Sequence, residues 1–184
     1  MRSPENRIAL HSLITGVPSF ALKVLDLNLR RPFYSADFVR SLLSICNVLK
    51  LNDDELMVLA GMLGRHCSFS PFFQNGCGGV ELAPEPCAFV GYLVKHYSLE
   101  YLILTCGAQG SFIFAKDGRS SYAPSVKVDI VDTVGAGDAF AAVCVDGLLN
   151  RLDLDEIQRR AARHAGFVCS RAGGMPAIPK SVLE

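Results

Sequence analysis

The chain has 184 residues, half of them hydrophobic and a fifth charged, and its 18 basic residues balance its 18 acidic ones. This composition excludes an intrinsically disordered chain and is sufficient for one domain with a sizeable core. A net charge of zero argues against a large basic surface for nucleic acid but does not exclude a local anion-binding site.

The cysteines and the polar N-terminus indicate a reducing compartment. The seven cysteines are an odd number, and none forms a Cys-x-x-Cys pair, which argues against a zinc ribbon or a thioredoxin-type motif. We expect reduced cysteines that mainly fill the core, with catalysis or metal binding as the alternative. The first ten residues are polar and charged, and no apolar run reaches the ~20 residues that span a bilayer. We therefore expect a cytoplasmic protein without a membrane partner.

In chain order, the first part of the sequence predicts two strands between three helices. Ser3 and Pro4 can open the first helix, Ser35 can cap the second, and acidic residues at 53–55 suit the positive end of the third. The expected elements are a helix over residues 3–14, a strand over 22–29, a helix over 35–46, a strand over 47–52 and a helix over 53–64.

The alternation continues after one segment without a clear period. Residues 64–87 are rich in Gly, Pro and Ser, and we expect a loop and a short helix there. The remaining expected elements are a helix over 87–97, a strand over 100–107, a hairpin over 110–124 with its turn at Asp117 and Gly118, a strand over 126–131, and helices over 139–150 and 153–173. Alternating strands and helices predict an α/β sandwich with a mostly parallel sheet.

The segment DTVGAGDAF, residues 132–140, has the features of an anion site at the start of a helix. Gly135, Ala136 and Gly137 lie between a predicted strand and a predicted helix, and such small residues let a ligand approach the backbone. The first amides of a helix lack internal partners, and the helix dipole favours an anion there. This turn is therefore predicted to bind a phosphate group.

Asp138 comes directly behind the predicted anion site. Because a carboxylate repels phosphate, it makes chemical sense as a base that accepts a proton from a hydroxyl attacking phosphorus. The structural alternative is that Asp138 caps the helix and the glycines only tighten a turn. A small-residue turn and an acid together at a strand-to-helix junction favour phosphoryl transfer.

The DTVGAGD segment resembles the signature of the ribokinase-like, or PfkB, carbohydrate kinases, and other segments agree in the same order. LKLNDDE supplies an Asn-x-x-Glu segment with Asn52 and Glu55, and TCGAQG supplies Thr105, Gly107 and Gly110. VLDLNLR resembles the Asp-x-Asn-x-Arg segment of the fructokinase-like branch, and AGFVCSRAGGMPAIP resembles the family's last helix and Gly-rich turn. The resemblance covers nearly the whole chain and implies a ribokinase-like three-layer α/β/α sandwich.

This resemblance implies an ATP-dependent sugar kinase with a role for each matching position. Asp138 would deprotonate the sugar hydroxyl, and the amides of residues 135–137 would form an anion hole for the transferred phosphate. Arg30 would neutralise phosphate or contact the sugar, with a solvated loop charge as its alternative.

The nucleotide and its metal would be held by further matching positions. Asn52 and Glu55 would organise Mg²⁺ and the phosphates, Glu55 through water, since magnesium retains its water. A helix cap with an acidic first turn is the alternative for this pair. The implied ATP contacts are Thr105, Gly107 and Gly110 for phosphates and ribose, with an ordinary turn as the alternative, and His164, Ala165 and Val168 for adenine.

A monovalent cation, K⁺ in the family pattern, would lie beside the anion hole. The matching positions are Asp132, the Val134 carbonyl and the carbonyls of residues 170–174. The alternative for Asp132 is a carboxylate that caps its own turn.

The resemblance also implies missing parts, because complete relatives are about twice as long and begin with a Gly-rich strand, sugar-binding residues and a β lid. We expect residues 1–184 to form one partial nucleotide-binding domain, with Met1 an internal or displaced start or a boundary imposed on a longer chain. An exposed sheet edge or apolar face would favour a homo-oligomer. Little kinase activity is expected of the isolated chain, since in-line attack depends on positioning and closure. The alternative function is a non-catalytic nucleotide-binding module.

Overall fold

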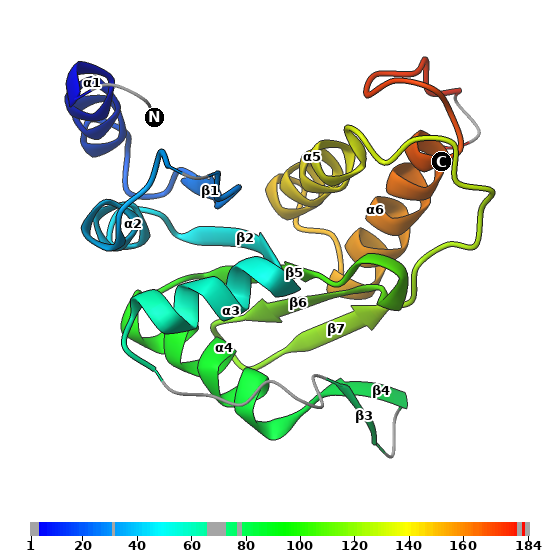
Figure 1. Cartoon of the computed structure of the whole chain (residues 1–184), viewed down its shortest axis with the longest axis horizontal. Helices are drawn as coiled ribbons and strands as arrows, with labels where there is room; N and C mark the ends of the chain where they lie inside the picture. The colour runs from blue at the N-terminus through cyan, green and yellow to red at the C-terminus, as the bar shows by residue number, and fades with distance from the viewer. Residues whose placement is uncertain (1–3, 31, 66–72, 77–78, 180–181, 183–184) are drawn as a thin grey trace. The chain divides into compact units, whose positions relative to one another are not determined.

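The computed structural model describes residues 4–30, 32–65, 73–76, 79–179 and 182 (Figure 1). One sheet consists of the strands Val24–Asp26 (β1), Val48–Asn52 (β2), Tyr101–Thr105 (β5), Ser111–Ala115 (β6) and Ser120–Ala123 (β7). A separate hairpin consists of Phe73–Gly76 (β3) and Gly79–Leu82 (β4). The helices are Pro4–Thr15 (α1), Ala36–Leu43 (α2), Asp53–Met62 (α3), Pro84–His96 (α4), Ala136–Leu149 (α5) and Leu154–Cys169 (α6), with a 3₁₀ turn at Gly107–Gln109 (η1).

The five-stranded sheet has the order β1-β2-β5-β6-β7. Its strands β1 and β2 are parallel, with Val24 opposite Val48, and β6 and β7 form an antiparallel hairpin. The sheet is open, mostly parallel and flanked by helices, which confirms the predicted α/β class. Among the strands described, β1 and β7 are the edges of the sheet.

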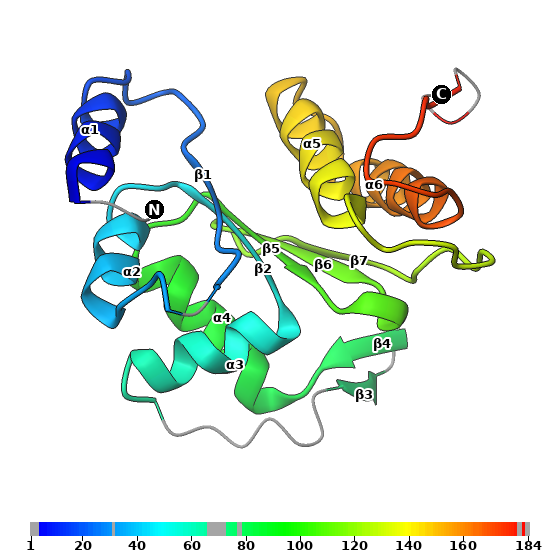
Figure 2. The same ribbon diagram turned by 45° about the horizontal axis from the view of Figure 1, so that its top comes forward.

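The chain divides into two compact units, Met1–Leu102 with Ala115–Asp117, and Ile103–Phe114 with Gly118–Glu184. In the first unit, the core is built from fully buried side chains of β2, α3 and α4, among them Leu49, Leu56 and Leu93. Burial of such leucines is worth roughly 1.5–3 kcal/mol each. In the second unit, α5 and α6 lie side by side (Figure 2), and Cys144 and Ile157 are fully buried.

Cysteines serve chiefly as core residues in the part of the chain that the structure describes. Cys46, Cys106 and Cys144 are buried, Cys169 is half-buried and Cys87 is exposed, and all five are reduced. Burial raises the pKa of the Cys46 thiol to about 12. The two remaining cysteines, Cys67 and Cys77, lie outside the described residues.

Most expected elements are present, including the hairpin with its turn at Asp117 and Gly118. The segment 64–87 contains the β3–β4 hairpin and the first turn of α4, so the separate short helix expected there is not found among its described residues. Its residues 66–72 and 77–78 lie outside the described part. The helix expected over residues 139–150 spans Ala136–Leu149, and the helix expected over residues 153–173 ends earlier, at Cys169.

The strand predicted over residues 126–131 was wrong, because this segment is irregular. Its valines do face one neighbour, since a Cβ added to Gly166 of α6 would lie 3.1 Å from Cβ of Val126 and 3.7 Å from Cγ1 of Val128. The Val131 amide then donates to the Cys169 carbonyl at 2.8 Å rather than to a strand. Val126 and Ile130 nevertheless stay exposed, by 42% and 70%, so alternation of apolar residues does not mark a buried strand here.

None of the described helices combines the length and the apolar character that crossing a membrane requires.

Candidate functional site

The start of α5 carries the predicted anion site, and its backbone has the form that such a site needs. Gly135 is the N-cap, with the left-handed angles φ 81° and ψ −9°. The Ala136 amide donates to the Thr133 carbonyl at 3.3 Å. Among the residues described, the amides of Gly137 and Asp138 donate no hydrogen bond within the chain. Two amides at the positive end of a 14-residue helix are therefore open to an anion.

Asp138 occupies the third position of α5, and its side chain is exposed. Asp138 is not the N-cap residue, because Gly135 occupies that position. Within the described part of the chain, the Asp138 carboxylate makes no ion pair or hydrogen bond. An uncommitted carboxylate next to two open amides can accept a proton from a hydroxyl that approaches a bound phosphate.

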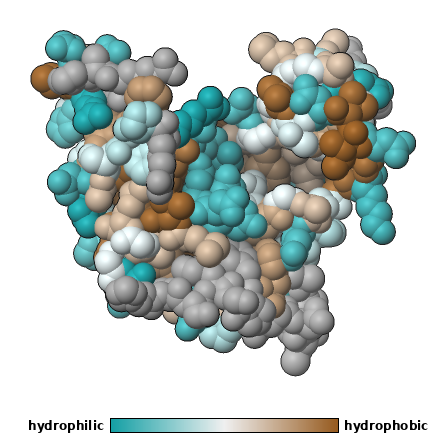
Figure 3. Space-filling view, in the orientation of Figure 1, coloured by the Kyte–Doolittle hydropathy of each residue, from teal (hydrophilic) through white to brown (hydrophobic). Residues whose placement is uncertain are grey.

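The loop before α5 packs closely on the loop after α6. A Cβ added to Gly135 would overlap the carbonyl oxygen of Gly174 and lie 2.7 Å from its Cα, so glycine is required by space as well as by φ. A Cβ added to Gly174 would in turn lie 3.2 Å from Cγ1 of Val134. Val134, Ile130 and Val131 are exposed by 64%, 70% and 61%, and hydrophobic surface is visible on this unit at the upper right of Figure 3. The loop thus turns apolar side chains outward while its backbone is fixed.

Asp132 fastens these two loops together. Its Oδ1 accepts from the Val134 amide at 3.0 Å, and its Oδ2 accepts from the Gly173 amide at 3.2 Å. These backbone hydrogen bonds lower the pKa of the Asp132 carboxyl. The carboxylate therefore caps its own turn, which was the alternative to cation binding. The monovalent-cation role of Asp132 and Val134 stays a prediction. Among the carbonyls of residues 170–174, that of Ser170 accepts from the Arg171 guanidinium at 3.1 Å.

The TCGAQG segment forms a closed turn between β5 and β6. Thr105 is half-buried at the end of β5, and the Cys106 amide donates to the Gly110 carbonyl at 2.8 Å across η1. Gly107 and Gly110 both have positive φ, of 53° and 98°. A Cβ on Gly110 would overlap the carbonyl oxygen of Ala123, so this glycine keeps the turn against the end of β7.

Two side chains, one in β7 and one just after it, donate hydrogen bonds to the carbonyls of this turn. The Tyr122 hydroxyl donates to the Gln109 carbonyl at 2.9 Å, and the Ser125 hydroxyl donates to the Ala108 carbonyl at 2.6 Å. Neither contact was predictable from the sequence, because both depend on the register of the hairpin. The carbonyls of the turn are thus bound by side chains, and its amides and Thr105 are the groups that a nucleotide phosphate could contact.

The three residues predicted to contact adenine lie on the last turns of α6. His164 and Val168 are buried, at 5% and 2% exposure, and Ala165 is half-buried. His164 Nδ1 lies 2.8 Å from the Arg160 carbonyl oxygen, which can only accept, so Nδ1 carries the proton. Of these three residues, Ala165 is the most accessible.

In the other unit, Asn52 and Glu55 form a capping box at the start of α3. Asn52 Oδ1 accepts from the Glu55 amide at 2.8 Å, and Glu55 Oε2 accepts from the Asn52 amide at 2.9 Å. The second carboxylate oxygen, Oε1, accepts from the Leu29 amide at 2.9 Å. Glu55 therefore brings the VLDLNLR segment to the N-terminus of α3, a link that the sequence did not reveal.

The VLDLNLR segment makes two further contacts. Arg30 is exposed, and its Nε donates to Asn28 Oδ1 at 3.2 Å. Asp26 pairs with the buried Lys50, whose Nζ lies 2.9 Å and 3.1 Å from the two carboxylate oxygens. Parallel pairing puts these two residues opposite each other, so the ion pair follows from the register of β1 and β2. Sequence reasoning missed it because the register was not known.

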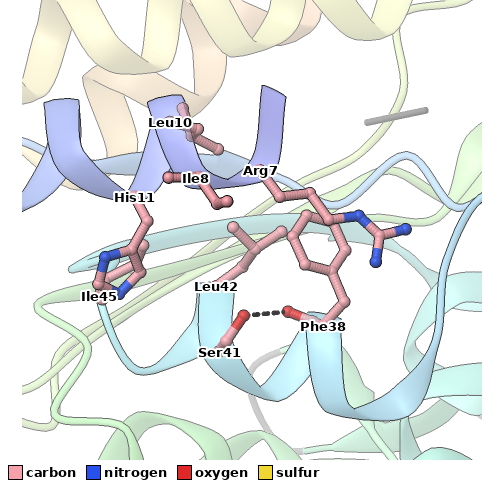
Figure 4. A pocket seen from close by; sticks show the side chains of 8 residues that line it. All are labelled: Arg7, Ile8, Leu10, His11, Phe38, Ser41, Leu42 and Ile45. Carbon is pink, nitrogen blue, oxygen red and sulfur yellow. Dashed lines mark hydrogen bonds between the residues drawn. The ribbon is translucent and has the colours of Figure 1, made fainter. Parts of the chain in front are cut away.

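A groove of about 200 Å³ between α1 and α2 contains none of the predicted site residues (Figure 4). It is mostly apolar, with the Arg7 guanidinium 4.4 Å from the centre of the Phe38 ring. Its lining residues are Arg7, Ile8, Leu10, His11, Phe38, Ser41, Leu42 and Ile45. In the described part of the chain, no group of three His, Cys, Asp or Glu side chains could hold a metal ion by itself.

Residues 19–181 match the pfkB family of carbohydrate kinases. The chain is 32% identical over 166 residues to probable fructokinase-6, chloroplastic, of Arabidopsis thaliana, which covers 84% of this chain and 38% of the relative. It is also 32% identical over 95 residues to fructosamine kinase FrlD of Bacillus subtilis, covering 52% of this chain and 33% of the relative. The chain thus spans less than half the length of these two relatives.

Solved structures show the same fold. A nucleoside kinase of Methanocaldococcus jannaschii, an archaeal member of the ribokinase family, superposes with a TM-score of 0.71 at 21% identity, covering 93% of this chain and 50% of its own. A putative ribokinase II of E. coli in complex with ATP and Mg²⁺ superposes with a TM-score of 0.74 at 17% identity, covering 94% of this chain and 50% of its own. The ribokinase-like fold class predicted from the sequence is confirmed.

Proposed function

The chain belongs to the pfkB family of carbohydrate kinases, and from that membership we propose that it carries the base and the nucleotide-binding elements of an ATP-dependent sugar kinase. The observation that carries the proposal is the start of α5. There an exposed, uncommitted Asp138 follows a left-handed Gly135 and two open amides. An acid and an anion site at one helix terminus are what transfer of a phosphoryl group to a hydroxyl requires.

In the proposed reaction, the sugar hydroxyl gives its proton to Asp138 as its oxygen attacks the γ-phosphorus of ATP. The bond from that phosphorus to the bridging oxygen breaks, and ADP leaves with the bond's electron pair. The open amides of Gly137 and Asp138 and the small side chain of Ala136 suit the transferred phosphoryl group. The packing of Gly135 on Gly174 makes the loop before α5 rigid. A loop that is already ordered does not have to lose conformational freedom when the phosphoryl group binds.

Mg²⁺ fits Glu55 through water better than by direct contact. Each Glu55 oxygen already accepts one backbone amide, and a carboxylate oxygen has a second lone pair for a metal-bound water. Bound magnesium would neutralise charge on the ATP phosphates. Asn52 Oδ1 accepts the Glu55 amide, so its role would be to keep that carboxylate in place.

For ATP, we assign Thr105, Gly107 and Gly110 to the phosphates and ribose, and the surface near Ala165 to adenine. Similarity to the Arabidopsis fructokinase and the VLDLNLR segment supports fructose or a related sugar as acceptor, with Arg30 as a phosphate or sugar contact. The M. jannaschii relative is a nucleoside kinase, so nucleosides belong in the test. K⁺ at Asp132 would be the accompanying monovalent cation.

The test is nucleotide binding and sugar-dependent ADP release in one set of samples. Calorimetry with ATP and Mg²⁺ measures binding to the 184-residue chain, and a coupled assay follows ADP with a panel of sugars and nucleosides. The same assay on a version extended to the length of the relatives supplies the remaining half of the family fold. Turnover with one panel member supports the kinase proposal. ATP binding without turnover in either version would favour the non-catalytic binding module instead.

A further inference from the structure

A buried polar network joins α6 to the β6–β7 hairpin inside the second unit. Gln158 of α6 is fully buried, and Ser111 and Ser121 beside it are nearly so. The Ser111 hydroxyl donates to Gln158 Oε1 at 2.7 Å. Gln158 Nε2 donates to the Ser111 carbonyl at 3.0 Å and to the Ser121 carbonyl at 3.1 Å. The Ser121 hydroxyl in turn donates to Asp155 Oδ1 at 2.5 Å.

The chemistry of these partners fixes the orientation of the Gln158 amide. Two of its partners are backbone carbonyls, which only accept, so both must face the NH₂ group. Both N–H groups of Nε2 and the oxygen Oε1 are then used, and the buried amide is satisfied. Satisfied buried networks specify one arrangement of the groups around them, because a shift would leave a polar group without a partner in the core.

The network meets the hairpin at the end that carries the TCGAQG turn. Ser111 is the residue after Gly110, and it pairs with Ala123 in the register of β6 and β7. Tyr122 and Ser125, which hold the turn carbonyls, lie just beyond Ser121 on the same strand and its continuation. β7 is an edge strand, and its Ser121 carbonyl accepts from the Gln158 side chain of α6. One amide thus holds both strands where they support the turn.

We propose that Gln158 is the positioning residue for the nucleotide-binding turn Thr105–Gly110. Its side chain is fully buried and cannot reach a bound nucleotide, so it acts by holding Ser111 and Ser121 and, through them, the turn. The same helix carries Ala165 two turns later, so Gln158 also sets the turn relative to the surface assigned to adenine. The inference rests on the proposed function, because it takes the turn as the phosphate and ribose site.

The variant Gln158→Leu tests the proposal, since leucine retains much of the volume and removes all three hydrogen bonds. Ser111→Ala removes only the contact to Oε1 and is the milder variant if Gln158→Leu does not fold. The control is Leu93→Ala, a core truncation in α4 of the other unit that lowers stability without touching the network. The first readout is amide hydrogen exchange over residues 106–110 in the ligand-free protein, and the second is the Kd for ADP by calorimetry.

We expect exchange at the Cys106 and Gly110 amides to accelerate at least about tenfold in Gln158→Leu and less in Ser111→Ala, because both amides are bonded within the turn. The Kd for ADP should rise by about tenfold to a hundredfold, because the turn would have to be ordered on binding. Leu93→Ala should show neither change. Equal exchange in Gln158→Leu and wild type, or an equal rise in Kd in Leu93→Ala, would overturn the inference. If wild type binds no ADP, the proposed function fails, and exchange alone then decides whether Gln158 positions the turn.

Discussion

The close approach of Gly135 to Gly174 gives a prediction that a glycine series can test. Gly135→Ala introduces two costs. The left-handed φ of 81° costs an alanine about 1–2 kcal/mol. Its Cβ would also overlap the Gly174 backbone, and relieving such an overlap costs typically about 1–3 kcal/mol. We therefore expect Gly135→Ala to lose about 2–5 kcal/mol of unfolding free energy.

Two other glycines supply matched controls. Gly173 and Gly118 have φ of 84° and 91°, and a Cβ on either would meet nothing within 4 Å. Alanine at these positions pays the conformational cost alone, about 1–2 kcal/mol. Gly173 lies in the same loop as Gly174, whereas Gly118 lies in the hairpin turn between β6 and β7. Comparing the two controls therefore separates a loss of stability specific to the Gly174 loop from the general cost of alanine at positive φ.

Urea unfolding at pH 7 measures the three losses, with Kd for ATP as a second readout. We expect Gly135→Ala to lose roughly 1–3 kcal/mol more unfolding free energy than either control, because only its Cβ overlaps another backbone segment. Among the three variants, only Gly135→Ala should weaken ATP binding strongly. Equal losses in all three variants would show that the two loops do not approach each other as described.

Three further predictions concern single side chains. N-ethylmaleimide at pH 8 should label Cys87 quickly and Cys46 at least about a hundredfold more slowly in the native protein, because burial raises the Cys46 pKa to about 12. Peptide mass spectrometry measures the two labelling rates, and equal rates would contradict the burial of Cys46. Asp132→Asn should be less stable than wild type at pH 7, and the gap should close as the pH falls below about 4, since a carboxyl with a lowered folded pKa stabilises only while ionised. A gap in urea midpoints that does not change with pH would refute this account. Glu55→Ala should cost about 1–2 kcal/mol by circular dichroism melts and speed hydrogen exchange at the Leu29 amide, and unchanged exchange there would rule out the link.

Local patterns predicted the parts of this fold that depend on neighbours in the sequence. The spacing of Asn52 and Glu55 predicted a capping box as an alternative to metal organisation, and the box is present. Ser35 was predicted to cap α2, and its hydroxyl accepts from the Phe38 amide at 3.3 Å. In such cases the interacting groups are three residues apart, so their geometry follows from the helix itself.

Contacts between distant segments were not predictable in the same way. The link from Glu55 to Leu29 spans 26 positions, and that from Gln158 to Ser111 spans 47. No periodicity encodes such pairs, since both depend on which strand lies beside which helix. For the segment at residues 126–131, the alternation of apolar residues predicted a strand, but the segment is irregular, lies against Gly166 of α6 at Val126 and Val128, and leaves Ile130 exposed.

The candidate site was predictable to the extent that it is local. The turn at residues 135–137, the acid at Asp138 and the start of α5 follow one another in the chain, so their juxtaposition was accessible from the sequence. The close approach of Gly174 to Gly135 and the hydrogen bond from the Gly173 amide to Asp132 come from a loop about 40 residues away. Those contacts decide how rigid the anion site is, and only the structure revealed them.

The most direct test of the central claim is sugar-dependent ADP release by wild type and Asp138→Asn, each extended to the length of the family's relatives. Asparagine keeps the size of the exposed side chain and removes its ability to accept a proton, so stability should change by less than about 0.5 kcal/mol. If Asp138 is the base, the variant keeps its Kd for ATP and loses turnover by about 10²–10⁴-fold. Turnover within threefold of wild type, with ATP still bound, would contradict the assignment of Asp138 as the base.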